Sequence, residues 1–169
     1  MNLTLFDLDG TLLPRDSDHA FGEFVVALGW ADGDEFRRRN DAFYDDYLAG
    51  RLDIDAYVDF ATAPWRGRPA EDLSRATARF LDEVVRPMLH PAALTLVQRH
   101  QREGDLVAIV TATNDFVTRP IAAVLGVEHL IATDLARDET GRVTGSIHGV
   151  PAFREGKIAR VQQWLAARG

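Results

Sequence analysis

Two aspartates that directly follow a short apolar run constrain the fold of this chain more than any other feature. Leu3 to Phe6 has the pattern of a short buried strand, and Asp7 and Asp9 come immediately after it. Side chains two positions apart on a strand point to the same face. We therefore expect both carboxylates in the crevice beyond the carboxyl end of the strand, where open α/β sheets bind ligands. Gly10 permits a sharp turn out of the sheet.

The close spacing of these carboxylates indicates catalysis. Two carboxylates this near repel each other unless a cation lies between them or one of them holds a proton. Both arrangements suit a reaction in which one carboxylate attacks beside a divalent metal ion and the other transfers a proton. A simple turn at a strand end would explain Asp9-Gly10, but it would not explain the apolar run before them or Thr11 after them.

The rest of the hydrophobic pattern predicts an α/β domain with a helical insert. Residues 16–88 contain four stretches with helical periodicity, separated by Gly or Pro, and no strand pattern. Leu106 to Val110 is β-branched and apolar on both faces, as a buried parallel strand should be. The other predicted elements are helices after Pro91, over 116–125 and over 155–167, a strand over 129–132 and a hairpin within 133–147. This order predicts a doubly wound parallel sheet with an insert after its first strand.

Composition narrows the class of ligand and the compartment. With 169 residues the chain suits one domain with a small inserted one. A net charge of -7 argues against non-specific binding to nucleic acid or to an anionic membrane, but it permits a phosphorylated small molecule. The absence of cysteine excludes disulfides and thiolate metal sites. Neither a signal peptide nor a membrane-spanning run is evident, so we expect a cytoplasmic protein.

Three segments resemble motifs of the haloacid dehalogenase (HAD) superfamily, most of whose members are Mg²⁺-dependent phosphatases. The apolar run with Asp7-Leu8-Asp9-Gly10-Thr11 resembles motif I, and Thr111 at the end of the Leu106–Val110 strand resembles motif II. Lys157, the only lysine of the chain, follows Phe153-Arg154-Glu155-Gly156, which resembles the F-x-E-G-K segment of phosphoserine-phosphatase-like members in subfamily IB.

The resemblance implies a fold and a mechanism. The fold is a HAD-like Rossmannoid parallel sheet with an all-helical C1 cap, divided into a core of residues 1–14 and 89–169 and a helical insert of residues 15–88. The activity is hydrolysis of a phosphate monoester of a small metabolite through an aspartyl-phosphate intermediate. The implied residues are Asp7 as nucleophile, Asp9 as acid and base, both as Mg²⁺ ligands (Asp9 through its backbone carbonyl), and Thr111, Ala112 and Lys157 as phosphate ligands.

The insert is expected to supply substrate specificity. Its candidate contacts are Asp16, Asp18 and His19 near the hinge and the arginines Arg37, Arg38, Arg39 and Arg51, since an arginine fork suits a carboxylate or a second phosphate. Consecutive arginines on a charged helix are, however, more often a solvated face. The aromatic residues Phe43, Tyr44 and Tyr47 could line a substrate pocket, but core packing is the favoured interpretation.

The resemblance ends before the fourth motif of the family, whose Asp completes the Mg²⁺ shell. No such segment follows Lys157, so we expect a chain that is truncated, is completed by another chain or is degenerate. The strands that normally follow would flank Leu3 to Phe6. Without them this strand becomes an exposed edge, through which two copies could pair as a homodimer.

Two other functions stay open. A binding or interaction protein of the same fold, with impaired catalysis, would explain the missing motif, although such a protein has little need for Asp9. A phosphotransferase would differ only in the group that accepts the phosphoryl group. Dehalogenation is disfavoured, because Asp9 and Thr111 indicate phosphoryl chemistry.

Overall fold

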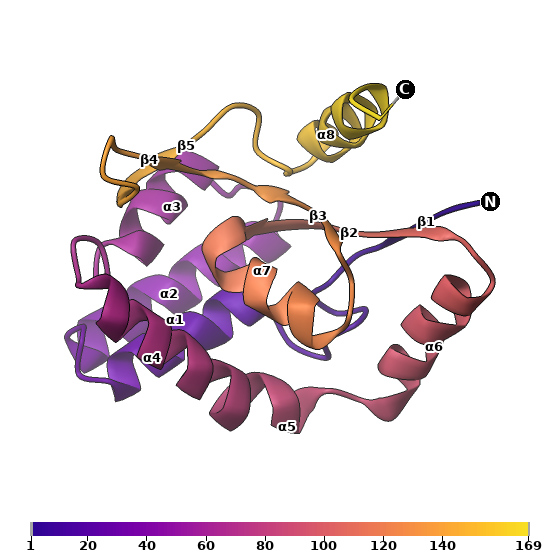
Figure 1. The fold of residues 1–169 in the computed structure, drawn as a ribbon. Coiled ribbons are helices and arrows are strands. Elements are labelled where there is room, and N and C mark those ends of the chain that lie inside the picture. The colour runs from indigo at the N-terminus through magenta and orange to yellow at the C-terminus, as the bar shows by residue number, and fades with distance from the viewer. Residues whose placement is uncertain (1, 169) are drawn as a thin grey trace.

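The computed structural model describes residues 2–168 and contains a parallel sheet with helices on both of its faces (Figure 1). The sheet consists of β1 (Leu3–Phe6), β2 (Leu106–Asn114) and β3 (His129–Thr133), in the order β1-β2-β3. Both pairings are parallel. A separate antiparallel hairpin is formed by β4 (Leu135–Arg137) and β5 (Val143–Ile147). The predicted α/β class with a parallel sheet is confirmed.

The helices follow the predicted order. They are α1 (Ser17–Ala27), α2 (Gly33–Leu48), α3 (Ile54–Thr62), α4 (Ala70–Phe80), a π-helical turn η1 (Leu81–Val85), α5 (Arg86–Met88), α6 (Pro91–Arg102), α7 (Asp115–Val124) and α8 (Glu155–Ala166). Several boundaries differ from the predicted ones, most clearly that of β2, which continues past Val110 to Asn114. The pairing register with β3 shifts between these two residues, and such an irregularity cannot be foreseen from the apolar run alone.

Aspartate side chains cap the N-termini of the first three helices of the insert. Asp16 accepts a hydrogen bond from His19 N at 2.8 Å, and Asp53 accepts one from Ala56 N at 3.1 Å. Asp32 caps α2 in the same way, by accepting a hydrogen bond from Glu35 N. These bonds satisfy N–H groups that lack a partner inside the helix, which is why Asp is favoured at this position. Among residues 2–168, no helix is both long enough and apolar enough to cross a membrane.

One hydrophobic core joins the sheet to the inner helices of the insert. Ile109 of β2 and Ile121 of α7 are fully buried, and Phe21 of α1 and Phe80 of α4 belong to the same cluster. The outer helices α2 and α3 share a smaller cluster centred on the stacked rings of Phe36 and Phe60, 4.5 Å apart. The inner helices therefore belong physically to the core, and the boundaries of a separate insert at residues 15–88 stay a prediction.

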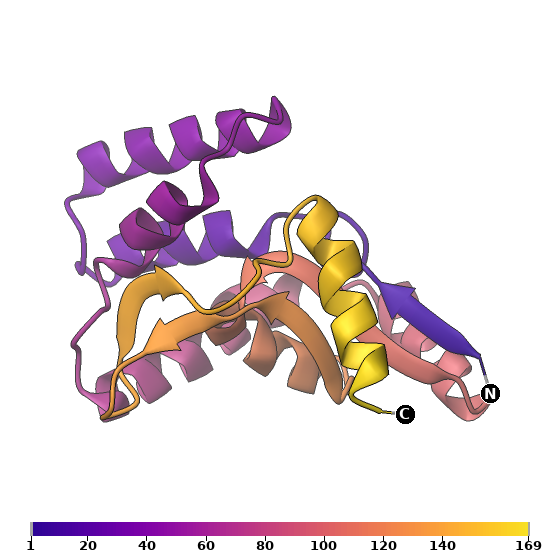
Figure 2. The same cartoon turned by 90° about the horizontal axis from the view of Figure 1, so that it is seen from above.

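The layers of the fold position the site. Figure 1 shows α8 over one face of the sheet and α6 and α7 over the other. Figure 2 shows α2 and α3 beyond the carboxyl ends of β1 and β2. Within residues 2–168, β1 is an edge strand, with Leu3 and Leu5 about two-fifths exposed, at 39% and 41%. Pairing of two copies through this edge stays a prediction.

Candidate active site

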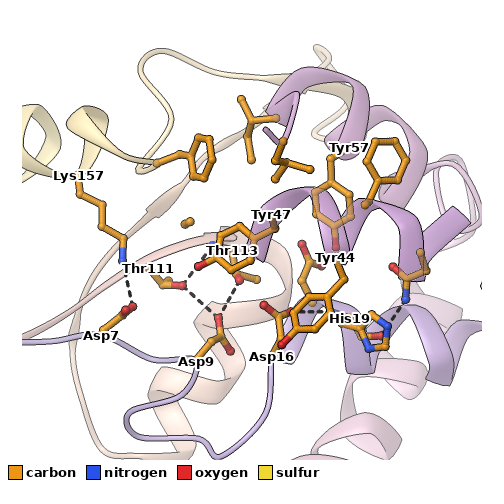
Figure 3. Close-up of a pocket in the computed structure, with 17 residues that line it drawn as sticks. Asp7, Asp9, Asp16, His19, Tyr44, Tyr47, Tyr57, Thr111, Thr113 and Lys157 are labelled. Atoms are coloured by element: carbon orange, nitrogen blue, oxygen red, sulfur yellow. Dashed lines mark hydrogen bonds and ion pairs between the residues drawn. The ribbon is translucent and has the colours of Figure 1, made fainter. Parts of the chain in front are cut away.

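The carboxyl ends of β1 and β2 meet α8 and the outer helices of the insert around a single pocket (Figure 3). Parallel strands place their carboxyl ends at the same edge of a sheet, which is where α/β proteins bind ligands. The pocket is lined by Asp7, Asp9, Asp16, Asp18, His19, Asn40, Phe43, Tyr44, Tyr47, Leu52, Ile54, Tyr57, Thr111, Ala112, Thr113, Phe153 and Lys157. The structure thus brings together every sequence-predicted site residue except the arginines Arg37, Arg38, Arg39 and Arg51.

Asp7 is held by an ion pair and by the backbone. Lys157 Nζ donates to Asp7 Oδ1 at 3.1 Å, and the N–H of Leu8 donates to the same oxygen at 2.9 Å. No hydrogen bond from residues 2–168 reaches the other oxygen, Oδ2. The Asp7 side chain is about half exposed, at 48%. It therefore offers a fixed carboxylate with one oxygen free to react or to bind a metal ion.

Asp9 is held more deeply by three donors. Ser17 N donates to Oδ1 at 2.7 Å, and Oδ2 accepts from Thr113 Oγ1 at 2.9 Å and from Thr111 Oγ1 at 3.5 Å. Burial raises the pKa of Asp9 to about 6, the negative charge of Asp16 adds to the rise, and these hydrogen bonds oppose it. A carboxyl group with such a pKa can both give and take a proton near neutral pH.

Two further aspartates lie deeper under the insert. Asp18 accepts from Asn114 Nδ2 at 3.2 Å, and burial raises its pKa to about 8, with the charges of Asp16 and Asp9 contributing. Burial likewise raises the pKa of Asp16. Lys157 and His19 are the basic side chains among the lining residues, so the pocket carries an excess of acidic groups. Such a pocket favours a cationic ligand group, which would stabilise the ionised carboxylates.

The aromatic wall of the pocket comes from α2 and α3. The preference for core packing is wrong for Tyr44 and Tyr47, which face the pocket (Figure 3). The Tyr44 ring lies 5.0 Å from the His19 ring. Phe43 packs against the outer cluster and also reaches the pocket. Helical spacing gathers these residues on one side of α2, but it does not tell whether that side meets a core or a cavity.

The sequence pattern does not reveal all of the site residues, and four arginines that it suggests lie elsewhere. Thr113 was not singled out, although its spacing of two from Thr111 within the β2 strand would have placed both hydroxyls on one face. Arg51 is not among the pocket-lining residues. Its guanidinium pairs with Asp46 at 2.9 Å, and its side chain is 68% exposed, so the structure gives no support for Arg51 as a specificity residue.

The donor set fits a hard divalent cation such as Mg²⁺. Asp7 and Asp9 supply carboxylate and backbone oxygens, which Mg²⁺ prefers, and the surplus of carboxylates around them would be offset by a positive charge. A compact group of three ligand residues occurs elsewhere in the described chain, at His100, Glu103 and Asp105 near the start of β2. Its side chains already pair, since His100 Nδ1 lies 2.8 Å from Asp105 Oδ2 and Glu103 binds Arg99.

Comparisons with known proteins show the family of this chain. Residues 4–169 match the family model of haloacid dehalogenase-like hydrolases. The chain is 40% identical over 168 residues to a protein of Neisseria meningitidis serogroup C named histidinol-phosphatase, covering 99% of this chain and 76% of that protein.

Solved structures of other proteins have the same fold. A Bordetella pertussis protein of unknown function superposes with a TM-score of 0.91 at 46% identity, over 99% of this chain and 75% of that one. A substrate-bound phosphoserine phosphatase shares the fold, with a TM-score of 0.67 at 17% identity, over 99% of this chain and 72% of that one. The predicted family and the predicted class of enzyme, a hydrolase of the phosphatase type, are confirmed. The chain belongs to the haloacid dehalogenase-like hydrolases.

Proposed function

We propose that this chain hydrolyses the phosphate monoester of a small cationic metabolite through an aspartyl-phosphate intermediate. The observation that carries the proposal is the convergence of Asp7, Asp9, Thr111 and Lys157 on one pocket from three separate parts of the chain. A nucleophile, a proton carrier and two phosphate ligands are the groups that this reaction needs.

In the first step, Asp7 Oδ2 attacks phosphorus and the bond to the leaving alkoxide breaks. Protonated Asp9 gives its proton to the alkoxide, so that a neutral alcohol leaves. Lys157, the Thr111 hydroxyl and the Ala112 N–H hold the equatorial oxygens, whose charge must be stabilised in the transition state. The Thr113 hydroxyl keeps Asp9 oriented through the 2.9 Å hydrogen bond.

In the second step, Asp9 takes a proton from water, which attacks phosphorus and releases Asp7 as a free carboxylate. The products are an alcohol and inorganic phosphate, and Asp9 is protonated again. The raised pKa of Asp9, about 6, suits a group that alternates between acid and base.

Mg²⁺ would be held by the Asp7 carboxylate and the Asp9 backbone carbonyl. When bound, the ion supplies positive charge that offsets repulsion between the phosphate and the Asp7 carboxylate. Lys157 also supplies positive charge here, since its ammonium already lies against Asp7.

Specificity would come from the acidic and aromatic side of the pocket. Asp16 and Asp18 offer two carboxylates with raised pKa values, and Tyr44 and Tyr47 offer ring faces. An ammonium group and a nitrogen heterocycle both suit such surroundings. The relative named histidinol-phosphatase supports an amino-alcohol phosphate of this kind, and we propose histidinol phosphate as the first substrate to test.

The deciding experiment measures phosphate release from histidinol phosphate, phosphoserine and p-nitrophenyl phosphate, each with Mg²⁺ and with EDTA. We expect Mg²⁺-dependent turnover with preference for histidinol phosphate. Asp16→Asn should lower kcat/KM for the two amines more than for p-nitrophenyl phosphate, whereas Asp34→Asn, at a fully exposed position on α2, should change nothing.

Binding of these phosphates without turnover would instead favour the catalytically impaired binding protein. Transfer of the phosphoryl group to added alcohols in preference to water would favour the phosphotransferase. A cytoplasmic location stays a prediction.

A further inference from the structure

The backbone of Arg154 has an unusual conformation. Within residues 2–168 it is the only non-glycine residue with a positive φ, at φ 51° and ψ -125°. Gly156 N donates to the Phe153 carbonyl at 2.9 Å, so residues 153–156 form a β-turn with Arg154 at its second position. These angles are those of a type II′ turn, which normally has glycine at this position. A side chain here strains the backbone.

This turn sets the start of the helix that carries Lys157. The Lys157 N–H donates to the Arg154 carbonyl at 3.0 Å. Only glycine fits at position 156 of this turn, because a Cβ there would lie 2.0 Å from the Pro151 carbonyl oxygen. The helix α8 has no fully buried residue, so packing alone holds it weakly. The conformation of the turn therefore places the backbone from which the Lys157 side chain reaches Asp7.

A contact with the helical insert accompanies the strained conformation. The Arg154 guanidinium donates to the carbonyl of Gly50, 104 residues away, at the C-terminal end of α2. Helix ends of this kind present carbonyl oxygens with partial negative charge, which attract a guanidinium. The guanidinium carbon also lies 4.8 Å from the centre of the Phe153 ring, which in turn lies 6.3 Å from the Tyr47 ring of α2.

The pocket is narrow in this structure. The pocket between the insert and the sheet is a cavity of only about 50 Å³, whereas pockets that hold small metabolites are typically about 300–1,000 Å³. An insert that opens to admit substrate would break its contacts with the turn before α8 and would form them again on closing. The contact of Arg154 with Gly50 is one of them.

We propose that Arg154 is a positioning residue that couples closure of the insert to the placement of Lys157. When the insert closes, the Gly50 carbonyl binds the guanidinium and holds the strained turn, and Lys157 reaches Asp7. When the insert opens, the contact is lost, the turn relaxes and Lys157 withdraws. Arg154 does not line the pocket, so it acts through Lys157. The inference rests on the proposed function only for the role of Lys157 in phosphate binding.

The chain offers a direct readout, because Lys157 is its only lysine. In a ¹⁵N-lysine sample of the full chain, one side-chain ammonium signal reports the surroundings of Lys157 at fixed pH. The variants are Arg154→Ala, which removes the guanidinium and keeps the strain, and Arg154→Gly, which removes both. Arg119→Ala is the control, at an exposed arginine on α7.

We expect the ammonium signal of Arg154→Ala to move to the position of a free lysine. Arg154→Gly should stay closer to the parent, because glycine adopts the turn without strain, and Arg119→Ala should match the parent. Equal signals in Arg154→Ala and Arg154→Gly would overturn the proposal, as would a free-lysine signal in the parent. Should Arg154→Ala fail to fold, Arg154→Gln gives the same comparison.

Kinetics provide the second readout. With p-nitrophenyl phosphate, kcat of Arg154→Ala should fall on the order of tenfold below that of Arg154→Gly. Equal kcat values in these two variants would contradict positioning. If the parent shows no turnover, the proposed function fails, while the order of the ammonium signals still decides the role of Arg154.

Discussion

Lys157 Nζ lies 3.1 Å from Asp7 Oδ1, although 150 residues separate the two in the sequence. The pair joins the segment after the first strand of the sheet to the first turn of the last helix, over the carboxyl ends of β1 and β2. It fixes the carboxylate that we propose as nucleophile and provides the positive charge that an incoming phosphate needs. The ion pair thus defines the centre of the candidate site, from which the following predictions start.

Replacement of the proposed nucleophile should abolish turnover. Asp7→Asn removes the attacking oxygen and one negative charge, while the side chain is about half exposed and supports little of the core. We expect loss of phosphate release with an unchanged circular dichroism spectrum and melting temperature. Parent-like activity in this variant would show that another group attacks phosphorus.

Removal of the only lysine should weaken phosphate binding. Lys157→Met keeps the side-chain length and deletes a charge-assisted hydrogen bond, which is typically worth about 1.5–3 kcal/mol. Inhibition of the reaction by inorganic phosphate should therefore weaken about 10- to 150-fold. The matched control is Arg75→Met, which removes an exposed cation on α4 that pairs with Glu71 and Asp72. An unchanged inhibition constant in Lys157→Met would exclude the ammonium from phosphate binding.

The buried carboxyl of Asp18 should make stability depend on pH. Its pKa rises from 3.8 to about 8 on folding because it is buried, so the folded protein keeps a proton that the unfolded chain has lost. This contribution to stability is complete below about pH 4 and is lost as the pH rises to about 8, at a rate of at most about 1.4 kcal/mol per pH unit.

Asp18→Asn removes this titration, so its free energy of unfolding should fall less than that of the parent between pH 5 and pH 8. Urea unfolding at several pH values measures the difference. Asp34→Asn, with a fully exposed side chain, should follow the parent. A parent-like slope in Asp18→Asn would mean that Asp18 is ionised in the folded protein.

Truncation of a core residue of β2 should destabilise the whole fold. Ile109 is fully buried, and Ile→Ala at such a site typically costs about 2–5 kcal/mol, from lost burial and the cavity left behind. Ile158 is 64% exposed on α8, so Ile158→Ala should cost much less. Similar losses of unfolding free energy in both variants would show that Ile109 is not central to the core.

Local sequence determined the elements and the residues that carry the chemistry. The apolar run before Asp7 predicts β1, and the β-branched run before Thr111 predicts most of β2, because strand pattern and burial are visible within a few residues. Aspartates and glycines mark the ends of helices, because the free N–H and carbonyl groups there need local partners or a special backbone. The family motifs then placed Asp7, Asp9, Thr111 and Lys157 in one site.

The tertiary structure decided which faces meet. The helical pattern of α2 is the same whether Tyr44 and Tyr47 meet a core or a pocket, and the charge of Arg51 does not reveal that it pairs with Asp46. The raised pKa of Asp18 and the contact of Arg154 with Gly50 likewise depend on segments far apart in the chain. Such features arise because burial and long-range contact are properties of the packed chain, whereas sequence patterns report only neighbours along it.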